Sequence, residues 1–155
     1  MTATNHGRSI TLLILAFVTL VAGIIFIQQG VSKYMLIKRL AATEKVTAGL
    51  TEEQIKRGEF VDSLRKMQTA GDLIRGHRQK IAPTYNELLG SGKYNPADPR
   101  QLTYSQAINL ENYLYLGALS FGITYLMMGV GLFMVLTSVS IGIISSYLWT
   151  KQIRQ

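Results

Sequence analysis

One histidine is the first residue in this sequence whose type suggests chemistry. His77 stands in RGHRQK, among basic neighbours, and the other histidine, His6, lies in the opposite tail. Nearby cations oppose the binding of a further cation, which disfavours a metal site. No serine or cysteine nucleophile motif accompanies His77, so a catalytic base would have nothing to activate. We therefore expect His77 to lie at the surface or the end of a helix.

Four carboxylates in the middle of the chain have the composition of an acid–base or metal site. Three of them follow roughly helical spacing, and basic residues stand between them; the acidic residues are Glu52, Glu53, Glu59 and Asp62, and the basic ones are Lys56, Arg57, Arg65 and Lys66. Opposite charges three or four residues apart on a helix form solvated ion pairs. We interpret the group as such a charged face rather than as a reaction centre.

Two further patterns suggest a bound ligand. Gly90-Ser91-Gly92-Lys93 is glycine-rich, but it lacks the G-x-x-x-x-G-K-[ST] spacing and no strand precedes it, so we interpret it as a turn. An aromatic and amide cluster suits either a quinone or pigment pocket or, more commonly, helix packing near a membrane interface; its members are Tyr104, Asn109, Asn112, Tyr113 and Tyr115.

Composition narrows the classes of function. The chain has 155 residues, no cysteine and a net charge of +7 from 16 basic and 9 acidic residues. A thiolate metal site and a disulfide framework are therefore excluded. The basic residues form no long run, which speaks against nucleic acid as a partner, and attraction to anionic lipid head groups is the simpler interpretation. We predict no cofactor.

The first hydrophobic block, Ser9 to Ile27, has 19 residues without a charge. As a helix it is about 29 Å long at ~1.5 Å per residue, which matches the hydrocarbon thickness of a bilayer. It exceeds the core of a cleaved signal peptide, and no A-x-A pattern follows it, so we predict an uncleaved anchor. The helical pattern continues through VSKYMLIKRLAATEK, beyond the bilayer.

The second hydrophobic block runs from Tyr113 to Trp149 without a charge. Its centre, MMGVGLFMV, contains no polar residue at which a hairpin would turn, so we predict one helix rather than two spans. Aromatic residues at Tyr125 and Tyr147 lie about 33 Å apart on a helix and mark the membrane-crossing part. Residues 104–124 then continue the same helix outside the lipid and need cover from the rest of the chain.

The start of this helix and the polar middle are predicted from capping signals. Thr103 and Gln106 have capping-box spacing, after a turn at Asp98-Pro99. Thr51 and Gln54 have the same spacing, and from there an apolar stripe predicts a helix that Pro83 ends near Lys80. One further helical turn, TYNELL, precedes a loop rich in glycine and proline. We expect these pieces to pack on the projecting ends of the two membrane helices.

These elements predict an all-α membrane protein with two long antiparallel helices. The predicted segments are a cytoplasmic tail (1–8), a first transmembrane helix (9–29), an extracytoplasmic helical segment that includes both projections (30–124), a second transmembrane helix (125–148) and a cytoplasmic tail (149–155). Both termini are placed inside because the short tails are basic, and the long middle is placed outside because long segments cross largely regardless of charge. The expected location is a bacterial plasma membrane.

Neither predicted span contains Asp, Glu, Lys, Arg or His, which argues against a proton relay or a charged pore. The hydrophobic segments instead contain small residues at the four-residue spacing that lets helices approach closely in lipid. The predicted packing residues are Gly23, Ala118, Gly122, Ser138, Gly142 and Ser146. Packing within the chain and docking onto another membrane protein both remain open for them.

Three stretches of sequence suggest a group of relatives. They are EKVT at 44–47, the helix with His77 that leads to APTYNELL, and LTYSQAINLENYLYL at 102–116, which runs into a glycine-rich span. In these the chain resembles small two-span membrane proteins of actinobacteria and some other bacteria. The resemblance implies the same layout, with the middle segment outside the cell membrane, and it implies no catalytic residue.

The expected function is that of a non-enzymatic accessory or stabilising subunit of a larger membrane complex, for which a respiratory or photosynthetic assembly is one setting. The expected partners are other membrane protein subunits and lipid. The alternative is an extracytoplasmic protein that binds a ligand or an envelope component, and an apolar pocket between the projecting helices and the middle helix would favour it. A membrane enzyme is the third hypothesis, and a loss of turnover on changing His77 or Glu59 would support it.

Overall fold

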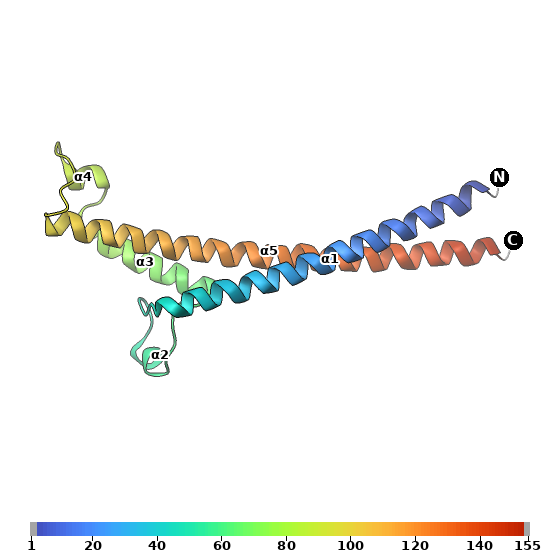
Figure 1. Ribbon diagram of the computed structural model, residues 1–155, viewed down its shortest axis with the longest axis horizontal. Coiled ribbons are helices and arrows are strands. Elements are labelled where there is room, and N and C mark those ends of the chain that lie inside the picture. Colours follow the sequence, from blue (N-terminus) through green and yellow to red (C-terminus); the bar gives the residue numbers. More distant parts are fainter. Residues whose placement is uncertain (1–2, 154–155) are drawn as a thin grey trace. The chain divides into compact units, whose positions relative to one another are not determined.

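The computed structural model describes the backbone of residues 3–153 and the side chains of residues 10–150. Within that range the chain is all-helical, as predicted, and contains no strand. Figure 1 shows the five helices. They are α1 (Ala3–Glu44), α2 (Glu52–Lys56), α3 (Leu64–Ile81), α4 (Tyr85–Leu89) and α5 (Pro99–Ile153).

The second hydrophobic block lies in one uninterrupted helix, which confirms the single-helix prediction. α5 has 55 residues and α1 has 42, and both are long and apolar enough to cross a membrane. α5 begins at Pro99 rather than at the predicted Thr103. The Asp98 carboxylate accepts the backbone N–H of Arg100 at 2.9 Å, and proline suits the first helical position because it has no N–H to satisfy. The hydroxyl of Thr103 donates instead to the Pro99 carbonyl.

The predicted helix from Thr51 to Lys80 is divided into two. Its start is as predicted, because Thr51 and Gln54 form a reciprocal capping box. α2 nevertheless ends at Lys56, and Gly58 follows with φ +72°, a conformation that favours glycine. The chain then turns, and the N–H of Val61 donates to the Val46 carbonyl at 2.9 Å before α3 begins. α3 ends just before Pro83, as expected.

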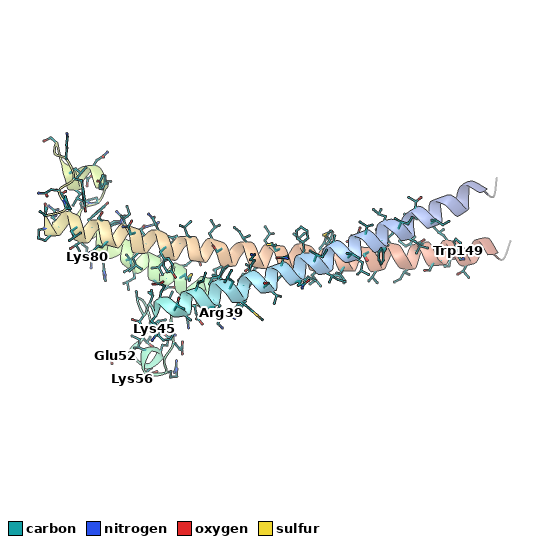
Figure 2. All side chains as sticks on the ribbon, in the orientation of Figure 1. Arg39, Lys45, Glu52, Lys56, Lys80 and Trp149 are labelled. Atoms are coloured by element: carbon teal, nitrogen blue, oxygen red, sulfur yellow. The ribbon has the colours of Figure 1, made fainter. Side chains whose placement is uncertain are left out.

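The chain divides into two compact units that α1 and α5 both enter. Unit 1 contains α1 up to Lys33 and α5 from Ile123 onward, and unit 2 is Tyr34–Gly122. In Figure 2 the labelled charged side chains, from Arg39 to Lys80, all belong to unit 2, whereas the labelled Trp149 belongs to unit 1.

The helix pair of unit 1 packs through small residues that recur every seven positions. On α1 the buried residues are Ala16, Gly23 and Gly30, and on α5 they are Thr124, Gly131, Ser138 and Ser145. The approach is closest at Gly23 and Gly131, where a Cβ on either residue would lie 2.8 or 2.7 Å from the carbonyl oxygen of the other. A seven-residue repeat keeps one seam of each helix facing its partner. Most of the large apolar side chains of this unit are exposed, although Ile27 and Met128 lie against the glycines of the contact.

Unit 2 has a conventional core of large side chains. Leu114 and Phe121 of α5 are fully buried, with Met67 of α3 and Val61 beside them. Phe121 meets the ring of Tyr34 edge-on at a centroid distance of 5.4 Å. α3 lies along α5 (Figure 1), and Gly71 permits this approach because Tyr115 packs directly against it. The residues of α5 before the predicted span therefore receive cover from α3 on one face.

Candidate functional site

His77 and the carboxylates suggested by the sequence form no reaction centre. His77 is exposed on α3, and no group of three potential metal ligands occurs among the residues with described side chains. Glu59 pairs with Arg57 at 2.9 Å and with Lys66 at 3.1 Å, and Asp62 pairs with Lys66 at 3.2 Å. The hydrogen bonds from Lys66 and Arg57 lower the pKa of Glu59 below its usual value. Glu59 and Asp62 thus form ion pairs, but in the connection between α2 and α3 rather than on a helix face, while Glu52 and Glu53 lie exposed in the first turn of α2.

The most strongly held charge lies elsewhere, at Glu111 of α5. Its carboxylate is 5% exposed and accepts one hydrogen bond from Arg75 Nε at 2.9 Å and one from Arg78 Nε at 2.7 Å. Arg78 also donates to the hydroxyl of Tyr104 at 2.5 Å. Burial acts to raise the pKa of Glu111, but the hydrogen bonds from Arg78 and Arg75 outweigh it and hold the pKa below its usual value.

This ion-pair cluster ties α3 to α5. The two arginines are one helical turn apart on α3. Both bind the carboxylate of Glu111 and neutralise its charge. The donors to Glu111 are arginines, which do not give up a proton near neutral pH, so they hold the carboxylate in its charged form. Because the cluster of Glu111, Arg75 and Arg78 joins α3 to α5, we call it the clamp.

The tyrosines that suggested a quinone or pigment pocket have separate partners. Tyr104 is buried beside Ala82 and Leu88, and the centre of its ring lies 6.3 Å from that of the tilted ring of Tyr85. The hydroxyl of Tyr115 donates to Asp72 at 2.5 Å, and Arg75 lies 4.7 Å from the centre of its ring. Tyr113 lies on the rim of an apolar groove, where burial, followed by the charge of Glu44, raises its pKa. The three rings therefore form no common pocket.

An apolar groove lies beside Tyr113 in unit 2. It is open to the outside and has a volume of about 230 Å³ between α1 and α5, and α3 contributes one residue. Its lining is Ile37, Leu40, Ala41, Met67, Tyr113, Leu116, Gly117 and Ser120. Gly117 is in direct contact with the sulfur of Met67. The lining is mostly apolar, with the hydroxyl-bearing residues Tyr113 and Ser120 among its members.

The predicted packing residues occupy different environments. Ala118 is buried in the core of unit 2, and Gly122 is half-buried near Leu64. In unit 1, Gly23 faces Gly131, and Ser138 is 4% exposed. Gly142 is half-buried with open space around it, and Ser146 is exposed, with its hydroxyl donating to the Gly142 carbonyl. The structure therefore brings the first four against other parts of the chain, but not the last two.

Two features of the structure were not predicted from the sequence. The small residues of unit 1 recur every seven positions, a pattern that the sequence contains, whereas the prediction rests on a four-residue spacing. The clamp at Glu111 has no local signal, because Arg75 is 36 residues away.

Several large side chains of unit 2 have no cover. On α1, Met35, Leu36 and Leu40 are 61%, 46% and 55% exposed, and on α5, Leu116 and Leu119 are 63% and 60% exposed. All five stand within the segment 30–124 that the sequence predicts to lie outside the lipid. Apolar side chains gathered on a surface in water mark sites of interaction with other molecules.

No family model, curated protein or solved structure matches the chain.

Proposed function

We propose that this chain is an integral membrane protein of two spans that acts as an accessory or stabilising subunit of a larger membrane complex. Unit 1 supports the membrane setting because small residues recur at its helix contact and most of its large apolar residues are exposed. Phe17 and Phe133, for example, are 66% and 69% exposed. Helices in lipid pack in this way, since lipid solvates large apolar side chains as well as a protein core does.

Unit 2 belongs outside the lipid in this proposal, on the extracytoplasmic side, with both termini in the cytoplasm. Its ion pairs and its core of large side chains are those of a domain in water. The basic tails and the length of the middle segment support this orientation, since short basic loops stay inside and long segments cross.

The uncovered apolar residues of unit 2 carry the proposal of an accessory role. Met35 and Leu119 are more than half exposed, and neither lines the groove. A protein partner would remove them from water and gain the hydrophobic free energy of their burial, about 1.5–3 kcal/mol for each fully buried side chain. No catalytic activity is included, because His77 is an exposed residue among cations and Glu59 and Asp62 are held in ion pairs.

Purification from native membranes in a mild detergent tests this role. We expect another membrane protein to co-purify with the chain, and we expect Met35→Gln combined with Leu119→Gln to reduce its recovery at least tenfold. The matched control is Gln106→Ala, an exposed polar position on α5. A wild-type chain that always runs without other proteins, or a recovery that the double substitution leaves unchanged, would contradict the accessory role.

The groove favours a second candidate, in which unit 2 binds an apolar ligand or envelope component. Its 230 Å³ between the projecting helices and α3 is the kind of pocket that this function needs. Native mass spectrometry of the gently purified protein would then detect a bound apolar molecule, and Ser120→Trp, which fills the groove, would displace it. Protein that carries no such molecule speaks against this candidate.

A further inference from the structure

One stretch of α1, residues 33–40, combines positive charge with exposed apolar side chains, and we call it the basic stretch. It contains Lys33, Lys38 and Arg39 but no acidic residue. Leu36 and Leu40 in the same stretch are 46% and 55% exposed. It follows directly on the predicted first span. Short basic segments beside a span usually stay in the cytoplasm, so three cations on the proposed outer side call for a physical reason.

Most of the positive charge in the basic stretch is unpaired. Lys33 and Arg39, the second of which is labelled in Figure 2, are exposed and form no ion pair with any residue whose side chain the structure describes. The side chain of Lys38 is 52% exposed and lies 3.8 Å from Asp62, a loose contact. By contrast, Lys66 contacts two carboxylates at 3.1 and 3.2 Å. Lys33 and Arg39 are therefore open to an anion from outside the chain.

The two unpaired cations and one leucine form a row on α1. Leu36 is three residues from Lys33 and three residues from Arg39, and residues three apart are neighbours on a helix surface. All three side chains are exposed. The row thus presents an ammonium, an aliphatic group and a guanidinium side by side. This combination suits the boundary of a phospholipid layer, where phosphate groups meet acyl chains.

The direction of α1 turns these cations toward the predicted span. Side chains on a helix lean toward its N-terminus, and the N-terminal part of α1 is the span that the sequence predicts to end at residue 29. Lys33 follows that residue by about 6 Å and Arg39 by about 15 Å, at ~1.5 Å per residue. A head-group layer is about 5–8 Å deep on each side of a bilayer. Lys33 thus lies at the depth of the phosphates, and Arg39 approaches them from the water.

We propose that the basic stretch binds the head group of an anionic phospholipid, with Lys33 as the principal contact and Arg39 as the second. A lipid with a net negative head group is favoured over a zwitterionic one, because each basic residue near an anionic surface contributes about fivefold in affinity. The inference rests on the proposed membrane setting of unit 1. It does not involve Met35 or Leu119, on which the accessory role depends.

Native mass spectrometry of the full chain in nanodiscs tests the proposal. The nanodiscs contain equal amounts of phosphatidylglycerol, which is anionic, and phosphatidylcholine, which is zwitterionic. We expect the wild type to retain phosphatidylglycerol at least fivefold over phosphatidylcholine, and Lys33→Gln combined with Arg39→Gln to bring this ratio close to one. The matched control, Lys80→Gln combined with Lys93→Gln, removes the same charge from exposed positions of unit 2 and should leave the ratio unchanged.

A charge-preserving variant separates electrostatic binding from a general disturbance of α1. Lys33→Arg combined with Arg39→Lys keeps both cations, so we expect it to retain at least half of the wild-type preference. Equal loss in this variant and in the glutamine variant would contradict binding through charge. Higher salt should weaken the wild-type preference, since exposed charges are screened.

The outcomes distinguish this inference from the proposed function. A chain that enters nanodiscs but retains both lipids equally would overturn the lipid site and leave the two-span architecture intact. A chain that does not enter nanodiscs would overturn both. If the lipid preference is absent and Lys33→Gln with Arg39→Gln instead reduces the recovery of a co-purifying protein, the basic stretch binds that protein, and the lipid site is wrong.

Discussion

Two phenylalanines on α5 show how differently its two ends are built. Phe121, in unit 2, is fully buried against Tyr34, whereas Phe133, in unit 1, is 69% exposed. Only 12 residues separate them on the same helix. In unit 2 large side chains fill the core and charges lie around it, while in unit 1 small residues form the contact and large ones face away.

In the proposed topology, this difference follows from the solvent around each unit. In water, burying a large apolar side chain is the main source of stability, so such residues go inside. In lipid that gain is absent, and close contact of backbones through small residues takes its place. The predictions below test this contrast, beginning with the largest effect.

Truncating the two phenylalanines is expected to have very unequal effects on stability. Phe121→Ala removes a fully buried ring and should lower the free energy of local unfolding of unit 2 by about 3–5 kcal/mol. Phe133→Ala should change the stability of unit 1 by less than about 0.5 kcal/mol, since its ring faces outward. Hydrogen exchange of the α3 and α5 amides in nanodiscs measures both. Equal losses of stability at the two sites would contradict the proposed contrast between unit 1 and unit 2.

Neutralising Glu111 should give the next largest effect. Glu111→Gln leaves Arg75 and Arg78 without the charge that they bind, and we expect a loss of ~2–4 kcal/mol in unit 2. The conservative exposed change Glu53→Gln serves as the control.

The same carboxylate makes the stability of unit 2 depend on pH. The pKa of Glu111 in the folded protein lies below its ordinary value of 4.5. Its stabilising effect is therefore complete above about pH 4.5 and is lost as the pH falls through the folded pKa. Hydrogen exchange at several pH values should show this acid-side loss in the wild type and a smaller one in Glu111→Gln. Identical slopes would contradict the role of the clamp.

Adding a methyl group by substitution with alanine is expected to affect two glycines of unit 1 differently. Gly131→Ala places a Cβ 2.7 Å from the backbone oxygen of Gly23, so the helices must separate, and we expect a loss of about 1–3 kcal/mol. Gly129→Ala adds the same methyl where nothing lies within 4 Å and should leave stability unchanged or slightly higher. Thermal unfolding in detergent compares them. A loss at Gly129 equal to that at Gly131 would contradict the close contact.

The smallest predicted effect concerns the cap of α2. Thr51→Ala removes the hydroxyl that accepts the Gln54 N–H and should cost about 1 kcal/mol, confined to α2. Amide exchange in α2 should quicken while exchange in α3 stays the same. A change that spreads into α3 would show that the two helices unfold together.

The helices were largely predictable from sequence because their signals are local. The apolar centre around Gly129 and Gly131 holds no turn residue, so one continuous α5 was the only consistent interpretation. The Thr51 capping box was also visible. Gly58 weakens the predicted helix, but the break itself was not predicted, and the hydrogen bond from Val61 to the Val46 carbonyl that follows it joins residues far apart in the sequence. The start of α5 was missed because Asp98-Pro99 was interpreted as a turn rather than as a cap followed by the first helical residue.

The packing surfaces were less predictable, since they depend on how the helices meet. Gly23 and Ser138 lie at the contact of unit 1, but Gly142 and Ser146 do not, because the contact repeats every seven residues rather than every four. Glu111 stands in LENYL, a pattern typical of any helix surface. Only the approach of α3 places Arg75 and Arg78 beside it.

Labelling of single cysteines in intact cells tests most directly whether unit 1 lies in lipid and unit 2 outside. Lys93→Cys, on an exposed loop of unit 2, should react with a membrane-impermeant maleimide added to the outside, while Phe133→Cys should not. Reporters fused at Met1 and at Gln155 should both be active in the cytoplasm. Lys93→Cys that is protected in intact cells and reacts only after lysis, or reporters on opposite faces, would contradict this architecture.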